Sequence, residues 1–173
     1  SRPFKILTHT EADEFDQPPQ FNAEQRKHHF YRSEGVQKLL NEQVRGDANR
    51  AHFVLSFGYF KAGKRFYTES RPRDRAYVAR QFNLAVEDLD DANYHPKTRL
   101  AHQLLILDFF GRRRFDDTAK QWLADEIRLA CRAQTPPKEL FHQLVDVLTD
   151  KAWELPPYQT LAQLISTGLN QHK

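Results

Sequence analysis

The segment Phe53–Phe60 constrains the fold most strongly, because it is apolar at nearly every position. A helix with apolar side chains on all its faces lies in the middle of a bundle, surrounded by other elements. The residues that flank the segment favour a helix over 48–62 rather than a short strand. Gly58 costs such a helix about 1 kcal/mol, so we expect a neighbouring helix to approach closely there. Gly63 is expected to serve as the C-terminal cap.

Prolines and short polar side chains mark the starts of further helices. Asn22, followed three residues later by Gln25, has the spacing of a capping box, and Ser33 is a second N-cap candidate. Pro72 and Pro96 fit the first turns of helices, where a missing N–H costs little. The expected helices are 11–15, 23–30, 34–43, 48–62, 72–82, 97–110, one from Asp116 or Asp117 to about Gln134, one opened by Pro136-Pro137, and 158–169.

Alternating apolar and polar runs rich in β-branched residues are nearly absent, so strands are not expected. The sequence therefore predicts an all-α fold, a compact bundle of about eight or nine helices. Its 173 residues suffice for one domain or for two small helical lobes. The acidic stretch Glu87–Tyr94 is the best candidate boundary, which gives an N-terminal lobe over 1–90 and a C-terminal lobe over 91–173. The connection is short, so we expect the lobes to pack together.

Composition excludes several classes of protein. The single cysteine, Cys131, rules out a disulfide framework within the chain and a zinc site built from several thiols. This cysteine usage is typical of a reducing cytosol, so we expect a cytoplasmic protein. No apolar run approaches the length of about 18–20 residues that spans a bilayer, and the N-terminus does not resemble a signal peptide. The absence of methionine, even at position 1, indicates a processed chain or a fragment.

Catalytic arrangements find little support in the sequence. Glu24 and His28 are four residues apart and could share a metal ion, but a solvated pair is the better interpretation. The acidic cluster Glu87–Asp91 could be imagined as a magnesium site, although a solvated linker is favoured. Cys131 is interpreted as a buried, inert thiol. No phosphate-cradling glycine loop or hydrolase motif is present. We therefore expect no enzyme activity, no cofactor, no metal and no small-molecule substrate.

Local charge points to nucleic acid, although the formal net charge is only +3. Residues 61–80 hold seven basic side chains against two acidic ones, and residues 97–114 hold five against one. Arginine has a fork geometry suited to phosphate, and a helix N-terminus favours an anion. Ordinary solvated charge is the alternative interpretation. The candidate DNA-contacting residues are Lys61, Lys64, Arg65, Arg71, Arg73, Arg75, Arg80, Lys97, Arg99, Arg112, Arg113 and Arg114.

Five stretches also carry a family resemblance. They are Phe15–Phe21 (FDQPPQF), Phe53–Ala62 (FVLSFGYFKA), Arg73–Gln81 (RDRAYVARQ), Pro137–Phe141 (PKELF) and Glu154–Leu161 (ELPPYQTL). In this order and at these spacings they resemble the N-terminal region of Tn-three family replicative transposases. Ser56 departs from the glutamine common in that family, and the loop 109–115 is more basic than usual.

The resemblance implies a module that recognises the terminal inverted repeats of a transposon in double-stranded DNA. It also implies that the acidic catalytic triad of the family lies downstream of these residues, so this chain should not cut or join DNA alone. An alternative expectation is a structural module that packs on the rest of a transposase or on another protomer. An independent nuclease would need a carboxylate cluster on a folded face, and only Glu87–Asp91 is available.

Overall fold

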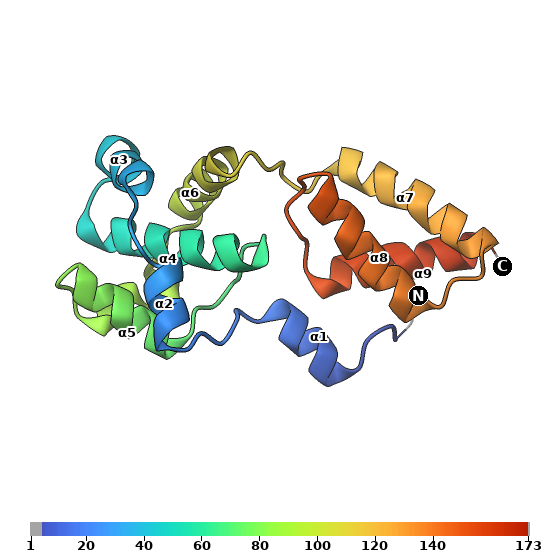
Figure 1. Cartoon of the computed structure of the whole chain (residues 1–173), viewed down its shortest axis with the longest axis horizontal. Helices are drawn as coiled ribbons and strands as arrows, with labels where there is room; N and C mark the ends of the chain where they lie inside the picture. The colour runs from blue at the N-terminus through green and yellow to red at the C-terminus, as the bar shows by residue number, and fades with distance from the viewer. Residues whose placement is uncertain (1–4, 173) are drawn as a thin grey trace. The chain divides into compact units, whose positions relative to one another are not determined.

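The computed structural model describes residues 5–172 and shows an all-α protein (Figure 1). Within those residues it contains no strand beyond an isolated bridge between Arg113 and Trp153. No helix among them is long and apolar enough to cross a membrane. The α-helices are α1 (His9–Asp16), α2 (Ala23–His29), α3 (Glu34–Gln43), α4 (Asp47–Gly63), α5 (Pro72–Gln81), α6 (Pro96–Phe109), α7 (Asp117–Arg132), α8 (Pro137–Asp150) and α9 (Tyr158–Gln171).

The chain divides into two compact units, at points other than the expected boundary near residue 90. Within the described residues, unit 1 comprises 5–16 and 110–172, and unit 2 comprises 17–109. The stretch interpreted as a linker folds instead as two short 3₁₀ helices, η1 (Val86–Leu89) and η2 (Asp91–Asn93). Leu89 is fully buried and η1 packs on both α4 and α5, so this stretch belongs to the interior of unit 2.

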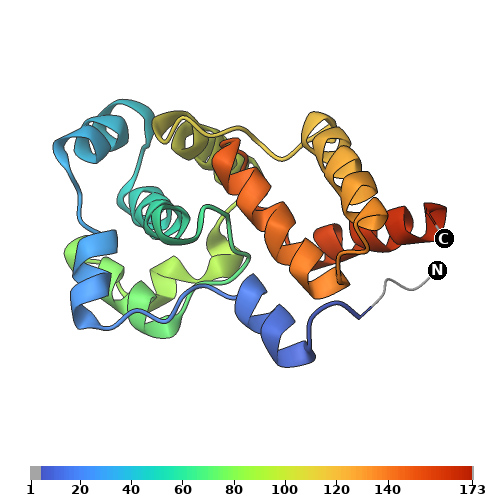
Figure 2. The same ribbon diagram turned by 45° about the vertical axis from the view of Figure 1, so that its right-hand side comes forward.

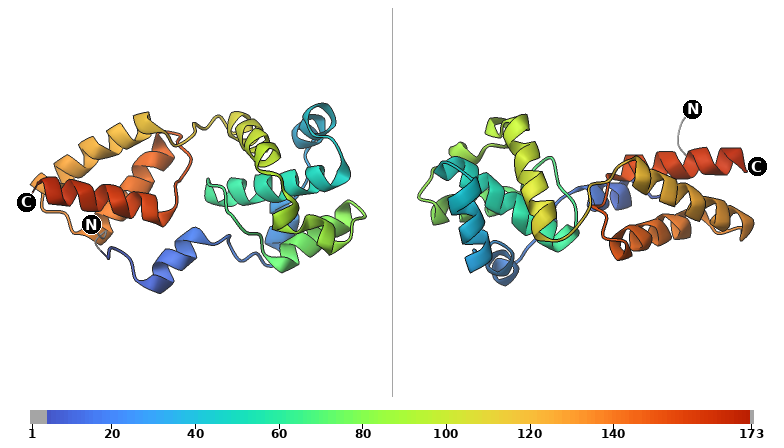
Figure 3. Two further views of the ribbon diagram at one scale, coloured as in Figure 1. Left: turned by 180° about the vertical axis from the view of Figure 1, so that it is seen from behind. Right: turned by 90° about the horizontal axis from the view of Figure 1, so that it is seen from above.

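Unit 2 is built around α4, as the apolar segment predicts. Nine of its residues between Ala51 and Phe60 are buried. Figures 1 and 3 show α3 and α6 on one side of α4, with α2 and α5 on the other, and the turned view of Figure 2 agrees. Helices α2, α5 and α6 all contact α4 directly. The central position of α4 therefore separates two outer surfaces of unit 2.

Two glycines of α4 allow neighbours to approach, one as expected and one in a different role. A Cβ on Gly58 would lie 2.4 Å from the Phe30 ring and 2.8 Å from the carbonyl oxygen of His29. The close approach predicted at Gly58 is thus confirmed. Gly63 is not the C-cap, because the left-handed residue is Lys64, with φ 56°. Gly63 instead leaves room for the Tyr67 hydroxyl, which would lie 2.2 Å from a Cβ.

Local capping signals act as the sequence predicts. Asn22 and Gln25 form a reciprocal capping box at the start of α2. The Ser33 side chain accepts a hydrogen bond from the Val36 amide in α3, and Asp116 accepts one from the Ala119 amide in α7. These bonds satisfy amides that have no partner inside their own helix.

Unit 1 is a three-helix bundle of α7, α8 and α9 completed by the N-terminal segment. The three helices contact one another in every pairing, and α1 packs on α9. The Tyr158 hydroxyl accepts hydrogen bonds from the amides of Ile6 and Leu7, both at 3.3 Å. The Asp16 carboxylate accepts one from the Tyr158 amide at 2.8 Å. Residues 6–16 thus complete the core formed by α7, α8 and α9.

Candidate nucleic-acid interface

Helix α5 turns its basic side chains outward and its acid inward. It begins at Pro72, directly after Arg71, and its only acidic residue is Asp74. Asp74 is 1% exposed and Val78 is fully buried, so these positions mark the inner side. Arg73, Tyr77 and Arg80 follow the spacing of one helical stripe on the opposite side. Arg73 and Arg80 are exposed and Tyr77 is half-buried. We call this stripe of three residues the α5 face.

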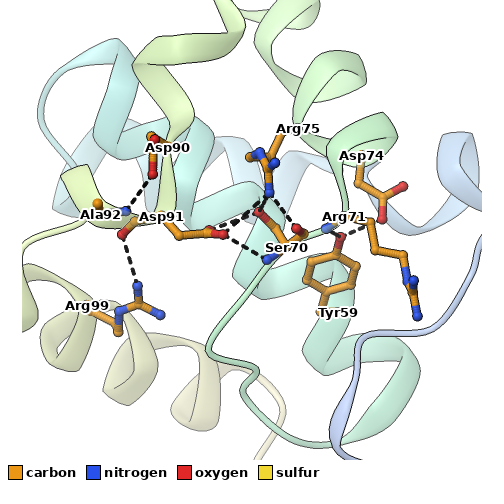
Figure 4. Close-up of polar contacts among 9 residues, drawn as sticks. All are labelled: Tyr59, Ser70, Arg71, Asp74, Arg75, Asp90, Asp91, Ala92 and Arg99. Carbon is orange, nitrogen blue, oxygen red and sulfur yellow. Dashed lines mark hydrogen bonds and ion pairs between the residues drawn. The ribbon is translucent and has the colours of Figure 1, made fainter. Parts of the chain in front are cut away.

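The buried Asp74 carboxylate joins three helices. It accepts a hydrogen bond from the Tyr59 hydroxyl of α4, and Arg26 of α2 donates to it from Nε at 2.8 Å. The Tyr59 oxygen in turn accepts the Arg71 amide at 3.0 Å, which Figure 4 shows at the start of α5. Burial and the neighbouring Asp74 raise the pKa of Tyr59 far above its usual range, so the phenol keeps its proton. These bonds hold α5 against the core with its outer face free.

Helix α2 contacts α5 through side chains at a few points. Besides the Arg26–Asp74 pair, the rings of Phe30 and Tyr77 lie 6.3 Å apart between centroids. Just beyond α2, the Arg32 guanidinium lies 4.4 Å from the centroid of the Phe82 ring. Side chains of α2 and α5 are therefore in contact on this side of α4.

A hollow of about 450 Å³ opens at the N-terminal end of α5. Its lining includes Arg26, Arg71 and Arg73, together with Pro72 and Asp74. Proline has no N–H, and the amides of Asp74 and Arg75 donate to the Arg71 carbonyl, so the helix dipole and the Arg73 side chain supply the positive potential at this end. Arg26 neutralises Asp74 by pairing with it. The hollow thus combines an exposed arginine, Arg73, with the positive end of a helix, an arrangement suited to an anionic oxygen.

Asp91 of η2 binds two of the arginines that the sequence singled out, Arg75 through its carboxylate and Arg99 through its backbone carbonyl, to which Arg99 donates at 3.5 Å. Its carboxylate accepts the Ser70 amide at 3.0 Å and the Ser70 hydroxyl at 2.9 Å, and pairs with Arg75 at 3.4 Å. Arg75 also donates to the Ser70 carbonyl (Figure 4). The Arg99 guanidinium lies 4.7 Å from the Tyr94 ring centroid. The guanidinium groups of Arg75 and Arg99 therefore have partners within unit 2.

The other candidates before α5 are divided between the interior and the surface. The Arg71 guanidinium donates two hydrogen bonds to the Pro18 carbonyl, at 2.9 and 2.7 Å. Arg65 is only 4% exposed and lies over the Tyr67 ring. Lys61 is exposed at the end of α4, whereas Lys64 is half-buried at its C-cap.

The three arginines after Gly111 belong to unit 1 and bind its framework. Arg112 donates to the carbonyls of Leu148, Thr149 and Trp153, with the shortest bond at 2.8 Å. Arg113 donates to the Lys151 carbonyl, and its guanidinium lies 3.6 Å from the Trp153 ring centroid. Arg114 pairs with Glu154 at 3.7 Å.

Lys97 lies on α6, on the other side of α4 from α5 (Figures 1 and 3). The structure thus places Arg73 and Arg80 together on the α5 face, beside the hollow, and separates Lys97 from them.

Unit 2 also carries most of the positive charge. Residues 17–109 hold 15 Lys and Arg against 11 Asp and Glu, whereas the rest of the chain holds 11 against 12.

A family model described as a domain of unknown function (DUF4158) matches residues 6–168. The chain belongs to this family. The matched residues include all of unit 2 and most of unit 1. No curated protein matches the chain.

In this DUF4158 chain, a further basic run lies near α5 that is not among the DNA-contacting residues predicted from the sequence. Residues 26–32 read RKHHFYR, and Lys27, His28 and Tyr31 are exposed on or just after α2. Its basic composition is visible in the sequence, whereas the sequence pattern here favours attention to the four-residue spacing of Glu24 and His28 as metal ligands. Among the described residues, no group of three or more His, Cys, Asp or Glu side chains could hold a metal ion. Residues 26–32 become a candidate DNA-contact surface only through their position near α5 in the folded chain.

Proposed function

We propose that unit 2 binds double-stranded DNA through the α5 face and the neighbouring end of α2. The observation that carries this proposal is the sorting of charge on α5. Arg73 and Arg80 are exposed on its outer stripe, while its only acid is buried and neutralised by Arg26. A solvated helix surface usually mixes both signs of charge. A stripe that is purely cationic supports contact with a polyanion.

The dimensions of the α5 face suit a duplex. Arg73 and Arg80 are seven residues apart, about 10 Å along the helix axis. The major groove is about 12 Å wide and admits one α-helix. An arginine near each end of α5 is therefore placed to contact phosphates or base edges, with Tyr77 between them. On this proposal, a backbone phosphate binds in the hollow beside Arg73.

We propose further that the chain is the DNA-binding N-terminal region of a Tn-three family transposase, and that the DNA it recognises is the terminal inverted repeat of the transposon. The resemblance supports this reading, because two of its stretches, 53–62 and 73–81, coincide with α4 and α5. On this proposal the chain binds transposon ends but leaves cutting and joining to the downstream part of the transposase.

Fluorescence anisotropy with labelled duplexes tests the proposal. We expect tighter binding of a transposon-end duplex than of a scrambled one. Replacing two phosphate contacts in Arg73→Ala/Arg80→Ala should weaken binding by about 10- to 100-fold and reduce the slope of log K against log salt by about 2. Lys120→Ala/Arg132→Ala removes the same charge from α7 of unit 1 and is the matched control.

The outcomes separate the parts of the proposal. Equal, weak affinity for both duplexes would remove sequence recognition but leave phosphate contact through α5. If the Arg73/Arg80 variant and the control bound DNA alike, the α5 face would not be the contact surface.

A protein-interaction module is the second candidate function. Leu100 and Leu104 of α6 are 48% and 52% exposed, and they lie one helical turn apart. Exposed apolar pairs of this kind often lie in contact surfaces. If the Arg73/Arg80 variant retained full DNA affinity while Leu100→Ser/Leu104→Ser abolished self-association or binding to the rest of a transposase, this function would replace DNA binding.

A further inference from the structure

We propose that two copies of this chain associate through the outer face of α6, with the two α6 helices packed antiparallel about a two-fold axis. Five exposed residues form this face: Lys97, Leu100, Ala101, Leu104 and Asp108. We call them the α6 seam. The proposal names the partner of the Leu100–Leu104 surface, so it rests on the protein-interaction candidate above and not on DNA binding by the α5 face.

The α6 seam lies opposite the side of α6 that packs on the core. The buried residues of α6 are His102, Ile106 and Leu107, and the helix contacts α4. With 3.6 residues per turn, positions 97, 101, 104 and 108 fall on the other side of the helix, and their alternating spacings of four and three are those of a coiled coil. The α6 seam is therefore turned away from α4, on the side of unit 2 opposite α5 (Figures 1 and 3).

The middle of the α6 seam is apolar. Leu100 and Leu104 are 48% and 52% exposed and lie one turn apart, with Ala101 between them in the sequence. The outer face of a surface helix is usually polar, so a leucine pair there favours contact with another apolar surface. Ala101 has a small side chain, which allows a second helix to approach closely.

The two ends of the α6 seam carry opposite charges. Lys97 lies in the first turn of α6 and Asp108 lies in its last turn. Within residues 5–172, neither side chain is in an ion pair. The two positions are eleven residues apart, close to three full turns, which is about 16 Å along the helix axis. The α6 seam thus has an apolar centre between one cation and one anion.

This pattern is complementary to itself in one orientation. Positions 97 and 108 lie symmetrically about the point between 102 and 103, and so do positions 101 and 104. In an antiparallel pair, Lys97 of one copy therefore meets Asp108 of the other at both ends, and Leu104 meets Ala101 between them. A two-fold interface needs a patch that matches itself in this way. A parallel pair would instead set Lys97 against Lys97, so the charges favour a second copy in the antiparallel orientation.

The expected dimer is weak. Stable interfaces bury about 1,200–2,000 Å² in total, and one helix from each copy covers less than that. We therefore expect a dissociation constant on the order of 100 μM for this chain alone.

Sedimentation equilibrium of the whole chain without DNA, at concentrations up to about 1 mM, tests the pairing. Lys97→Glu turns two attractive contacts into repulsive ones and should weaken the dimer about tenfold, and Asp108→Lys should do the same. The double variant Lys97→Glu/Asp108→Lys should regain the affinity of the parent chain. Lys38→Glu makes the same charge change at an exposed position of α3 and is the matched control.

Weakening in both single variants with recovery in the double variant supports the antiparallel pair, because a parallel pair has the same number of like-charge contacts in all four chains. A chain that stays monomeric would overturn the proposal and leave the α6 seam to a different partner. Dimerisation that Lys97→Glu and Lys38→Glu affect equally would also overturn it. The Arg73/Arg80 variant should dimerise as the parent chain does, so this test and the DNA titration can fail separately.

Discussion

At the scale of single residues, Tyr94 brings two buried histidines together in unit 2. Its ring stacks on His52 at 4.4 Å between centroids, and its hydroxyl binds His102. Burial lowers the pKa of both imidazoles, to about 4 for His102. Around His52, Asp91 and Asp90 act to raise the pKa and Arg99 acts to lower it, but desolvation dominates. Both rings are therefore folded in their neutral form.

These histidines should make the stability of unit 2 sensitive to mild acid. The pKa of each is lower in the folded than in the unfolded chain, so between those values the unfolded state binds more protons. Stability is full above pH 6.5 and falls as the pH drops toward 4. For His102 the loss amounts to about 3 kcal/mol. Urea unfolding followed by circular dichroism at pH 7, 5.5 and 4.5 measures it.

A matched pair of variants isolates the histidine contribution from that of the carboxylates. His102→Gln should reduce the dependence between pH 6.5 and 4 and leave the part due to His52, whereas His142→Gln, exposed on α8, should leave it unchanged. The explanation fails if both variants keep the pH dependence of the parent chain.

At the scale of elements, the segment 112–114 fastens the end of α8. Carbonyl groups in the last turn of a helix have no partner inside it. Those of Leu148 and Thr149 each accept one amide from the turn that follows, of Trp153 and Ala152, and can accept a second donor. Arg112 supplies donors to Leu148 and Thr149 in that turn, and to Trp153 beyond it. Backbone bonds between Arg113 and residues 152 and 154, both at 2.7 Å, hold the two segments side by side. This cluster of arginines thus acts within unit 1 as a helix cap.

Arg112→Ala should therefore destabilise unit 1 by about 2 kcal/mol, because buried carbonyls lose a charged donor. Both tryptophans, Trp122 and Trp153, lie in unit 1, so their fluorescence during denaturation reports on this unit alone. Arg128→Ala is the control, since its exposed pair with Asp125 is worth only a few tenths of a kcal/mol. Equal midpoints for the two variants would show that Arg112 is not a cap.

At the scale of the whole molecule, chain order and spatial order differ. Unit 2 is continuous, but unit 1 combines the first segment with the last three helices. Besides the Tyr158 contacts, Lys138 of α8 pairs with Glu11 of α1 at 2.6 Å. Burial of Ile6 and Leu7 adds apolar contact to this closure.

Fragments test this division. Residues 17–109 have their own core around α4 and should fold alone into a helical domain with dispersed amide resonances. Residues 110–173 alone should be less stable than the same residues with 5–16 added as a separate peptide. A disordered 17–109 fragment would contradict the division, as would a 110–173 fragment that gains nothing from the peptide.

The sequence by itself determined the helices, because their signals are local. Caps such as Asn22 and Ser33, prolines at first turns and the apolar segment 53–60 act within a few residues. The all-α fold and nearly every helix boundary follow from them. The same local signals misled at 86–93, where an acidic composition typical of a linker conceals Leu89, fully buried among α4 and α5.

Only the tertiary structure decided which charges are free, because a charge count does not reveal partners distant in sequence. Arg71 binds Pro18, 53 positions away, and Arg112 binds Trp153, 41 positions away. Asp91 of η2 forms an ion pair with Arg75 of α5. The α5 face remains exposed because Asp74, Tyr59 and Arg26 from three helices hold the opposite side of α5 against the core. The composition of residues 17–109 determines the net charge of unit 2. Long-range packing determines which of its charged side chains have partners inside the fold and which are exposed.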